Sequence, residues 1–276
     1  MRIFIILFAT IGLWSCAPKS KVDESSKKRI VSLNGAITET IYALNQGDNL
    51  VGVDVTSTYP AEVDQVEKLG YVRSVNLEKI ISLEPDFVLA NDGEISQEQI
   101  QTLQSAGILV DVIKRKYSVD GTIEMIQNIG ELFDEKDKAS ALINEIKLDS
   151  LITPVQPKKV LFIYSRGPGN LLVAGTNTPA SAIIELALGK NAITDVEGYV
   201  PLNVEYLIKT NPDYILMFDS GLESLGGKDA LTAIEGISQT NAWKNDNIIS
   251  MEGHLLAGFG PRVHIAATAL NKLLYN

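Results

Sequence analysis

Histidine and cysteine are scarce in this chain. Its 276 residues include two histidines, His254 and His264, and one cysteine, Cys16. A single cysteine excludes a disulfide within the chain. Two histidines are too few for a metal site that combines several imidazoles with a carboxylate. The sequence therefore predicts no metal centre built from these side chains alone.

Motifs of common catalytic sites are missing as well. No G-x-S-x-G nucleophile motif occurs, and residues 221–228 differ from a Walker loop in spacing and lack a Ser or Thr after the lysine. The glycines at 167 and 169 lack the third glycine and the helix of a dinucleotide fingerprint. Because Asp and Glu are abundant, no two of them stand out as a catalytic pair. We predict a protein that is not an enzyme and has no catalytic cofactor.

Positive charge is also in deficit. The chain has 24 Lys and Arg against 34 Asp and Glu, which gives a formal net charge of −10. Binding to nucleic acid requires clustered basic residues that neutralise phosphates, and no basic stripe appears. We therefore expect no nucleic acid partner.

A long apolar run occurs at the N-terminus, over residues 3–14. It is too short to span a bilayer and is typical of a signal-peptide core. The run leads into Leu13-Trp14-Ser15-Cys16, which resembles the bacterial lipoprotein box, although the tryptophan is atypical. An ordinary signal peptide with an incidental cysteine is the alternative. We predict a lipoprotein signal peptide over residues 1–15, lipidation of Cys16 and a flexible tether over residues 16–28.

The predicted signal peptide and lipidation site place the mature protein in the cell envelope. We expect it on the periplasmic or extracytoplasmic face, bound to the membrane only through its N-terminal lipid anchor. No later segment of the sequence is long and apolar enough to cross a membrane.

One stretch of the chain occurs twice. Residues 70–90 and residues 198–217 both begin with Gly-Tyr and continue with an Asn, a Glu, an apolar helix face, Pro-Asp and an apolar strand. From Asn76 and Asn203 onward the copies align without a gap. Solenoid repeats recur at about 20–50 residues, so the repeat instead indicates two similar lobes, each with a tyrosine at the corresponding place.

Strands alternate with helices in both halves, which predicts α/β lobes over residues 29–118 and 158–276. A helical linker is expected over residues 119–157. Its second helix, over residues 135–152, would be roughly 27 Å long at ~1.5 Å per residue and would join the lobes as one rigid helix. We predict two α/β lobes with central parallel sheets and a ligand between them, at the carboxyl ends of the strands.

Tyr71 and Arg73 are the residues most suggestive of chemistry. In an extended segment, side chains two positions apart point to the same face. A neighbouring guanidinium favours the phenolate form of tyrosine, and tyrosine is a known axial ligand of haem iron. The alternative is a tyrosine packed on a lobe edge and an arginine in a surface ion pair.

From Arg29 to Asn276 the chain resembles the periplasmic haem-binding proteins of ABC-type haem importers, within the class III cobalamin- and siderophore-binding proteins that have a helical backbone between two lobes. The stretches that carry this resemblance are residues 29–35, 51–57, 69–73, 173–175, 198–202 and 258–262. The resemblance implies a monomer that binds ferric haem b as its transported ligand. It also implies delivery to an ABC permease dimer that works with a cytoplasmic ATPase.

The resemblance also implies roles for individual residues. In the Gly-Tyr-x-Arg element, Tyr71 would be the axial iron ligand and Arg73 the support of its phenolate. Some relatives add a histidine in a Ser-His-Gly turn of the second lobe, where this chain has Arg166, so we expect five-coordinate iron. Arg166 and Arg262 are candidates for pairing with a haem propionate, with a surface role as the alternative. Tyr199, in the second Gly-Tyr, is expected to line the cleft.

Glu78 and Glu205 hold equivalent positions in the two copies of the repeat. The resemblance implies that they dock onto arginines of the permease, and one carboxylate per lobe suits a two-fold dimer. The alternative is stabilisation of a helix N-terminus, which contributes ~0.3–1 kcal/mol.

Other functions remain open from the sequence. Cobalamin or a ferric siderophore is the alternative ligand for the same fold. A secreted α/β enzyme acting on tetrapyrroles is disfavoured by the missing nucleophile motif and the scarcity of histidine. A haem store or relay without a permease is a third alternative.

Overall fold

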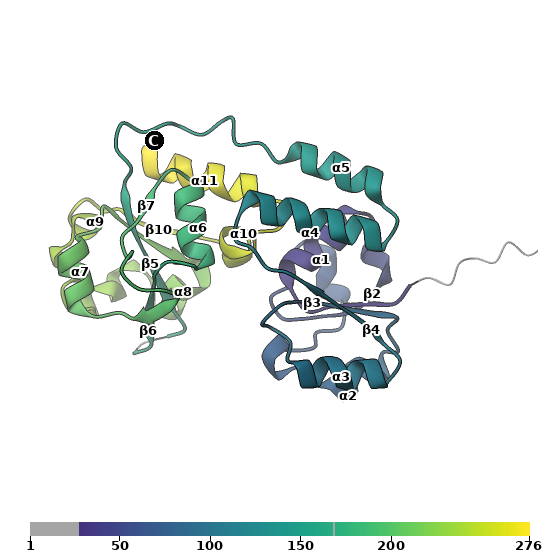
Figure 1. The fold of residues 1–276 in the computed structure, drawn as a ribbon. Coiled ribbons are helices and arrows are strands. Elements are labelled where there is room, and N and C mark those ends of the chain that lie inside the picture. The colour runs from purple at the N-terminus through teal and green to yellow at the C-terminus, as the bar shows by residue number, and fades with distance from the viewer. Residues whose placement is uncertain (1–27, 168) are drawn as a thin grey trace, which may run out of the picture.

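The structure is a computed structural model that describes residues 28–167 and 169–276. The predicted signal peptide, Cys16 and the tether up to residue 27 lie outside this part. The described chain forms two α/β lobes that lie next to each other (Figure 1). Within it, no helix combines the length and apolar character needed to cross a membrane.

The N-terminal lobe is built on a parallel sheet with strand order β2-β1-β3-β4. Its strands are β1 (Ile30–Ser32), β2 (Leu50–Val53), β3 (Phe87–Asn91) and β4 (Leu109–Ile113). Its helices are α1 (Gly35–Ala43), α2 (Leu77–Ser82) and α3 (Gln97–Ser105), followed by α4 (Val119–Leu132) of the linker. Successive strand residues face opposite sides of a sheet. Ile30 and Leu89 accordingly pack with α1 and α4, while Val31 and Val88 pack with α2 and α3.

The C-terminal lobe has a mixed sheet with the order β10-β9-β5-β6-β8, and β7 also pairs with β5. Its strands are β5 (Lys159–Ser165), β6 (Leu171–Ala174), β7 (Lys190–Asn191), β8 (Tyr199–Pro201), β9 (Tyr214–Phe218) and β10 (Ile248–Met251). Its helices are α6 (Pro179–Leu186), α7 (Val204–Thr210), α8 (Asp219–Ser224), α9 (Asn241–Lys244), α10 (Gly253–Ala257) and α11 (Val263–Tyr275).

The expected parallel pairing holds for β5, β7, β9 and β10, whereas β6 runs antiparallel to both β5 and β8. For the β5–β6 pair, the reason is the short connection over residues 166–170. Parallel strands need a crossover of about a dozen residues or more, so a connection this short joins an antiparallel pair.

The repeated stretch takes the same structure in both lobes. The side chain of Asn76 caps α2 by accepting the backbone N–H of Lys79 at 3.1 Å, and Asn203 caps α7 by accepting that of Tyr206 at 2.9 Å. These caps satisfy backbone donors that the first turn of a helix leaves free. The repeated asparagine therefore begins the equivalent helix in each lobe.

The repeated Pro-Asp pair ties each helix-to-strand crossover to the central strand. The Asp86 carboxylate accepts the backbone N–H of Arg29 at 2.7 Å, and the Asp213 carboxylate accepts that of Lys159 at 2.9 Å. In return, the N–H of each aspartate donates to the carbonyl of the same partner at 2.8 Å. The two lobes thus share one internal pattern of hydrogen bonds.

The connection between the lobes differs from the single long helix expected over residues 135–152. Helix α5 (Lys136–Glu145) ends early, and residues 146–158 continue as non-helical chain to β5. An extended chain advances about 3.3 Å per residue against about 1.5 Å in a helix, so this segment spans the junction with few residues. In Figure 1 it passes over α11 before it enters the C-terminal lobe.

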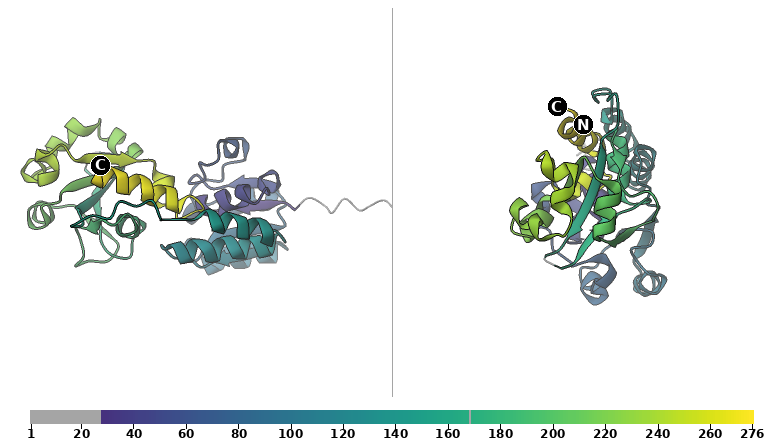
Figure 2. Two further views of the ribbon diagram at one scale, coloured as in Figure 1. Left: turned by 90° about the horizontal axis from the view of Figure 1, so that it is seen from above. Right: turned by 90° about the vertical axis from the view of Figure 1, so that its left-hand side faces the viewer.

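Side-chain packing explains why the helix stops. Ile146 packs against core clusters of both lobes, and Leu148 packs against the C-terminal one. Asn271 of α11 is fully buried and holds the backbone of Ile152 through both its N–H, at 2.7 Å, and its carbonyl, at 3.0 Å. Seen from above (Figure 2), α11 extends from the C-terminal lobe toward α4 at the junction.

Candidate ligand-binding cleft

Tyr71 and Arg166 meet across the two lobes. Tyr71 directly precedes a short 3₁₀ helix, η3 (Val72–Ser74), and the residue is 54% exposed. The Arg166 guanidinium, from the β5–β6 connection, lies 5.4 Å from the centre of the Tyr71 ring and 5.5 Å from that of Tyr164. Its Nε also donates to the Tyr164 hydroxyl. Because a cation within about 6 Å of an aromatic ring is attracted to it, Arg166 brings Tyr71 and Tyr164 together.

Arg73 does not stand beside Tyr71 in the way that extended alternation predicts. Residues 72–74 form the 3₁₀ turn η3, in which the N–H of Ser74 donates to the Tyr71 carbonyl at 2.9 Å. This 3₁₀ turn interrupts the alternation of an extended strand. The premise of an extended segment was wrong, and the positive group that contacts the Tyr71 ring is Arg166.

Aromatic side chains of the C-terminal lobe form a wall behind this contact. Tyr199, on β8, lies 6.0 Å from Tyr164 and 6.4 Å from Phe162 between ring centres, and Phe218 lies 5.9 Å from Tyr164. Burial raises the pKa of the Tyr199 hydroxyl, and repulsion from the phenols of Tyr117 and Tyr164 adds to the rise. Tyr199 is therefore a neutral phenol within a group of aromatic rings, and its role in lining the cleft stays a prediction.

A pocket of about 360 Å³ is lined by residues of both lobes, and Tyr71, Arg166 and Tyr199 are not among them. The N-terminal lobe contributes the start of α1, the end of β4 and the start of α4, and the C-terminal lobe contributes the start of α6 and the segment around α10. The pocket thus lies at the carboxyl ends of β1 and β4, the edge at which α/β proteins bind ligands.

Glu94 is the most enclosed carboxylate of this pocket. Its side chain is 14% exposed and lies 2.5 Å from the Arg115 guanidinium, while the amide of Asn34 donates to it at 3.3 Å. Burial raises the pKa of Glu94, and Arg115 only partly counteracts the rise. The sequence had not singled out Glu94, because one acidic residue among 34 carries no local signal.

Arg262 lies at the lobe junction rather than beside Tyr71. It binds Glu39 of α1 through Nε at 3.0 Å, Nη2 at 2.9 Å and its backbone N–H at 3.2 Å. Its guanidinium also lies 3.5 Å from the ring centre of Tyr59. Arg262 borders a separate pocket with Glu39 and Tyr59 and does not line the pocket that contains Arg115.

Glu39 is the centre of this junction, which we call the Glu39 cluster (Glu39, His254 and Arg262). The Glu39 side chain is 5% exposed, and His254 Nε2 lies 3.0 Å from its Oε2. Burial alone would raise the pKa of Glu39, but hydrogen bonds from His254 and Arg262 bring it below its ordinary value. The cluster therefore joins the lobes through a buried carboxylate.

Glu78 and Glu205 occupy matching places outside the cleft. Both are exposed on the first turn of the equivalent helices α2 and α7, one in each lobe. Their geometry agrees with the repeat from which they were selected.

Comparison with known proteins covers both lobes. A profile of the periplasmic binding protein family matches residues 30–255. The chain is 33% identical over 258 residues to the uncharacterized ABC transporter substrate-binding lipoprotein YvrC of Bacillus subtilis (strain 168), covering 90% of this chain and 80% of that protein. It is 28% identical over 251 residues to the cobalamin-binding protein of Halobacterium salinarum (strain ATCC 29341 / DSM 671 / R1), covering 87% and 67%.

A solved structure is similar over the same range. The periplasmic heme-binding protein RhuT from Roseiflexus sp. RS-1, in its apo form, superimposes with a TM-score of 0.86 at 34% identity, covering 90% of this chain and 98% of that one. The expected class III architecture of two α/β lobes is thereby confirmed.

Proposed function

The chain belongs to the periplasmic binding protein family, and we propose that it captures ferric haem between its two lobes and delivers it to an ABC permease. The family and the relatives bind solutes rather than transform them. The protein is accordingly a solute-binding component of an ABC importer, and haem is its proposed ligand.

The contact between Tyr71 and Arg166 carries this proposal. A phenol ordinarily has a pKa near ~10, so it ligates iron at neutral pH only where the phenolate is favoured. The Arg166 guanidinium keeps its charge at every physiological pH and lies 5.4 Å from the centre of the Tyr71 ring, so it would offset the negative charge of a Tyr71 oxygen bound to iron. Tyr71 thus offers an oxygen ligand that suits ferric iron, and haem bound there would replace part of the contact between the lobes.

The other cleft residues have supporting roles in the proposal. Tyr199 offers a flat, neutral surface on which a porphyrin stacks. Arg73 is exposed two residues after Tyr71 and is not the cation at its ring in this structure, so in the proposal it would support the phenolate only after its side chain turns toward Tyr71. Arg166 is also the candidate for pairing with a propionate, whereas Arg262 would first have to leave Glu39.

Delivery would use the two exposed carboxylates. Glu78 and Glu205 present one negative charge per lobe to a permease dimer, which a cytoplasmic ATPase drives. In this proposal the protein acts as a monomer on the outer face of the cytoplasmic membrane or in the periplasm, held there by lipidated Cys16.

Absorbance titration with hemin tests the proposed ligand. The purified protein should give a saturable Soret change with a high-spin ferric-phenolate signature. Tyr71→Phe keeps the ring beside Arg166 and removes only the hydroxyl, so it should abolish that signature, whereas Tyr206→Phe on α7 should retain it. An unchanged spectrum in Tyr71→Phe would refute Tyr71 as the iron ligand.

Cobalamin is the second candidate, because a relative at 28% identity is named for binding it. Saturable binding of cyanocobalamin, with no Soret change on addition of hemin, would transfer the function to cobalamin uptake. Hemin turnover by the isolated protein would instead indicate an enzyme.

A further inference from the structure

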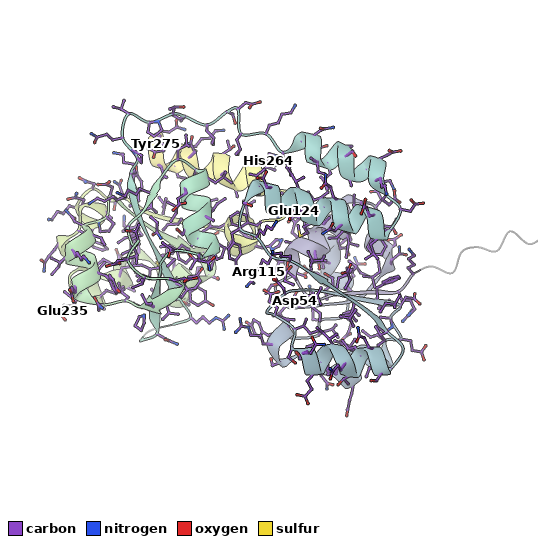
Figure 3. The ribbon with its side chains drawn as sticks, in the orientation of Figure 1. Asp54, Arg115, Glu124, Glu235, His264 and Tyr275 are labelled. Carbon is purple, nitrogen blue, oxygen red and sulfur yellow. The ribbon has the colours of Figure 1, made fainter. Side chains whose placement is uncertain are left out.

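Three consecutive basic residues line the pocket formed by residues of both lobes. Lys114, Arg115 and Lys116 follow β4 directly, are exposed, and all border the pocket. Figure 3 shows Arg115 where the two lobes face each other. We call these three residues the cationic floor. The chain has a net charge of −10, so three adjacent basic residues at one pocket are unusual for it. Their positive charges suit a ligand that carries negative groups.

The carboxylates near the floor are engaged elsewhere or matched one to one. Arg115 pairs with Glu94, and Lys116 pairs with Glu124 at 2.7 Å. Asp92 accepts the backbone N–H of Arg115 at 2.7 Å, and Glu252 accepts two backbone N–H groups of α10 at 2.7 Å. The Lys114 side chain has no hydrogen bond or ion pair with any described residue, so its ammonium group is available to a ligand.

Helix ends add to this positive potential. The first residue of α1, Gly35, and the third residue of α4, Gly121, both line the pocket. The N-terminus of a helix carries roughly half a positive charge, and these helices are nine and 14 residues long. The cationic floor and the two helix ends therefore act on the same cavity.

We propose that the cationic floor binds carboxylate groups of the ligand, with Lys114 as the main contact, so that the cleft selects tetrapyrroles whose acidic side chains are free. This inference rests on the proposed function and deepens it. Tyr71 at the lobe edge would hold the metal, and the floor would hold the acidic edge of the same molecule. A ligand whose acids are masked as esters or amides would lose the second contact.

Protoporphyrin IX and its dimethyl ester test the floor without iron. Binding is measured by quenching of tyrosine and tryptophan fluorescence, which does not depend on ligation by Tyr71. The wild-type protein should bind the free acid about three- to tenfold more tightly than the ester, as expected for a charge-assisted contact. Lys114→Gln should remove most of that preference, and Lys114→Glu should reverse it.

Lys190→Gln is the matched control. Lys190 is an exposed lysine whose strand β7 pairs with Lys159 at the amino end of β5, the opposite edge of the sheet from the cleft. This variant should keep the full preference for the free acid. Loss of the preference in Lys190→Gln to the same degree would indicate a general effect of charge and would overturn the inference.

The outcomes separate the inference from the proposed function. If hemin gives its Soret change but acid and ester bind equally well in wild type, the floor does not bind carboxylates and the proposed function stands. If the acid is preferred and Lys114→Gln removes the preference while hemin gives no Soret change, the floor is supported and iron ligation is refuted. Equal binding of acid and ester together with no response to hemin refutes both.

Discussion

Replacement of Glu39 by glutamine tests whether the charge of Glu39, rather than the size of its side chain, stabilises the junction between the lobes. Glu39→Gln keeps the size of the side chain and removes its charge. In the wild type, that charge accepts Arg262 Nε and Nη2 at 3.0 and 2.9 Å and lies 3.0 Å from His254 Nε2. These partners come from the C-terminal lobe and Glu39 from the N-terminal one, so the change acts on the junction itself.

The expected loss follows from burial. Removal of one partner from a buried ion pair costs about 3–5 kcal/mol. The Arg262 side chain is 21% exposed, and glutamine keeps one acceptor oxygen, so we expect the smaller loss of about 2–3 kcal/mol. For a protein of this size that loss lowers the Tm by about 4–12 °C.

The pH dependence of the unfolding free energy gives a second expected result. The pKa of Glu39 is lowered in the folded protein from its ordinary value of 4.5. Its stabilising contribution is therefore complete above the unfolded value and is lost as pH falls through the folded value. The Glu39 contribution to the difference in unfolding free energy between wild type and Glu39→Gln should shrink as pH falls below about 4.5.

Urea unfolding followed by circular dichroism at several pH values measures both effects. Glu131→Gln is the control, because Glu131 pairs with Lys136 at 3.4 Å on the surface with both side chains 65% exposed. Such a pair contributes about 0–1 kcal/mol. If Glu39→Gln costs no more than Glu131→Gln, or if their pH profiles coincide, the buried carboxylate does not stabilise the junction.

Three further variants test other parts of the structure. Asn271→Ala should cost about 2–4 kcal/mol in urea unfolding, because it leaves the buried backbone bonds of the connecting segment without partners. Arg166→Ala should weaken hemin binding about fivefold in the absorbance titration, as expected for loss of a cation–π contact of about 1 kcal/mol; equal affinity would exclude Arg166 from the site. Joint replacement of Glu78 and Glu205 by alanine should leave hemin binding intact and stop hemin uptake by cells, whereas Glu98→Ala should affect neither; normal uptake by the double variant would refute docking through these residues.

The repeat carried most of what the sequence predicted about the fold. Two copies of Asn-x-Glu and Pro-Asp indicated two lobes because each motif has a local function: the asparagine caps a helix and the aspartate binds the first strand. Such motifs can be recognised in a sequence because their side chains accept backbone N–H groups, which do not depend on the identity of the partner residue.

Contacts between distant segments were not predictable in the same way. Glu39 and Arg262 are 223 positions apart, and no motif around either residue indicates that they form an ion pair. The helix expected over residues 135–152 failed because tertiary packing of Leu148 overrides helical periodicity. The cationic floor was accessible in principle, since Lys114 to Lys116 follow a strand at the edge where parallel sheets bind ligands.

The two Gly-Tyr pairs explain why the lobes differ at the cleft. Gly70 and Gly198 both have positive φ, 88° and 76°, and each carbonyl accepts a backbone N–H from the neighbouring segment, so both tyrosines leave equivalent turns. Tyr199 then enters β8, where pairing with β6 fixes it in the aromatic wall and burial raises its pKa. The N-terminal lobe has no described counterpart of β6. Tyr71 is instead followed by a 3₁₀ helix, and its exposed ring contacts Arg166. Equivalent turns thus place the two tyrosines in different surroundings, which is the asymmetry on which the proposed roles of Tyr71 and Tyr199 rest.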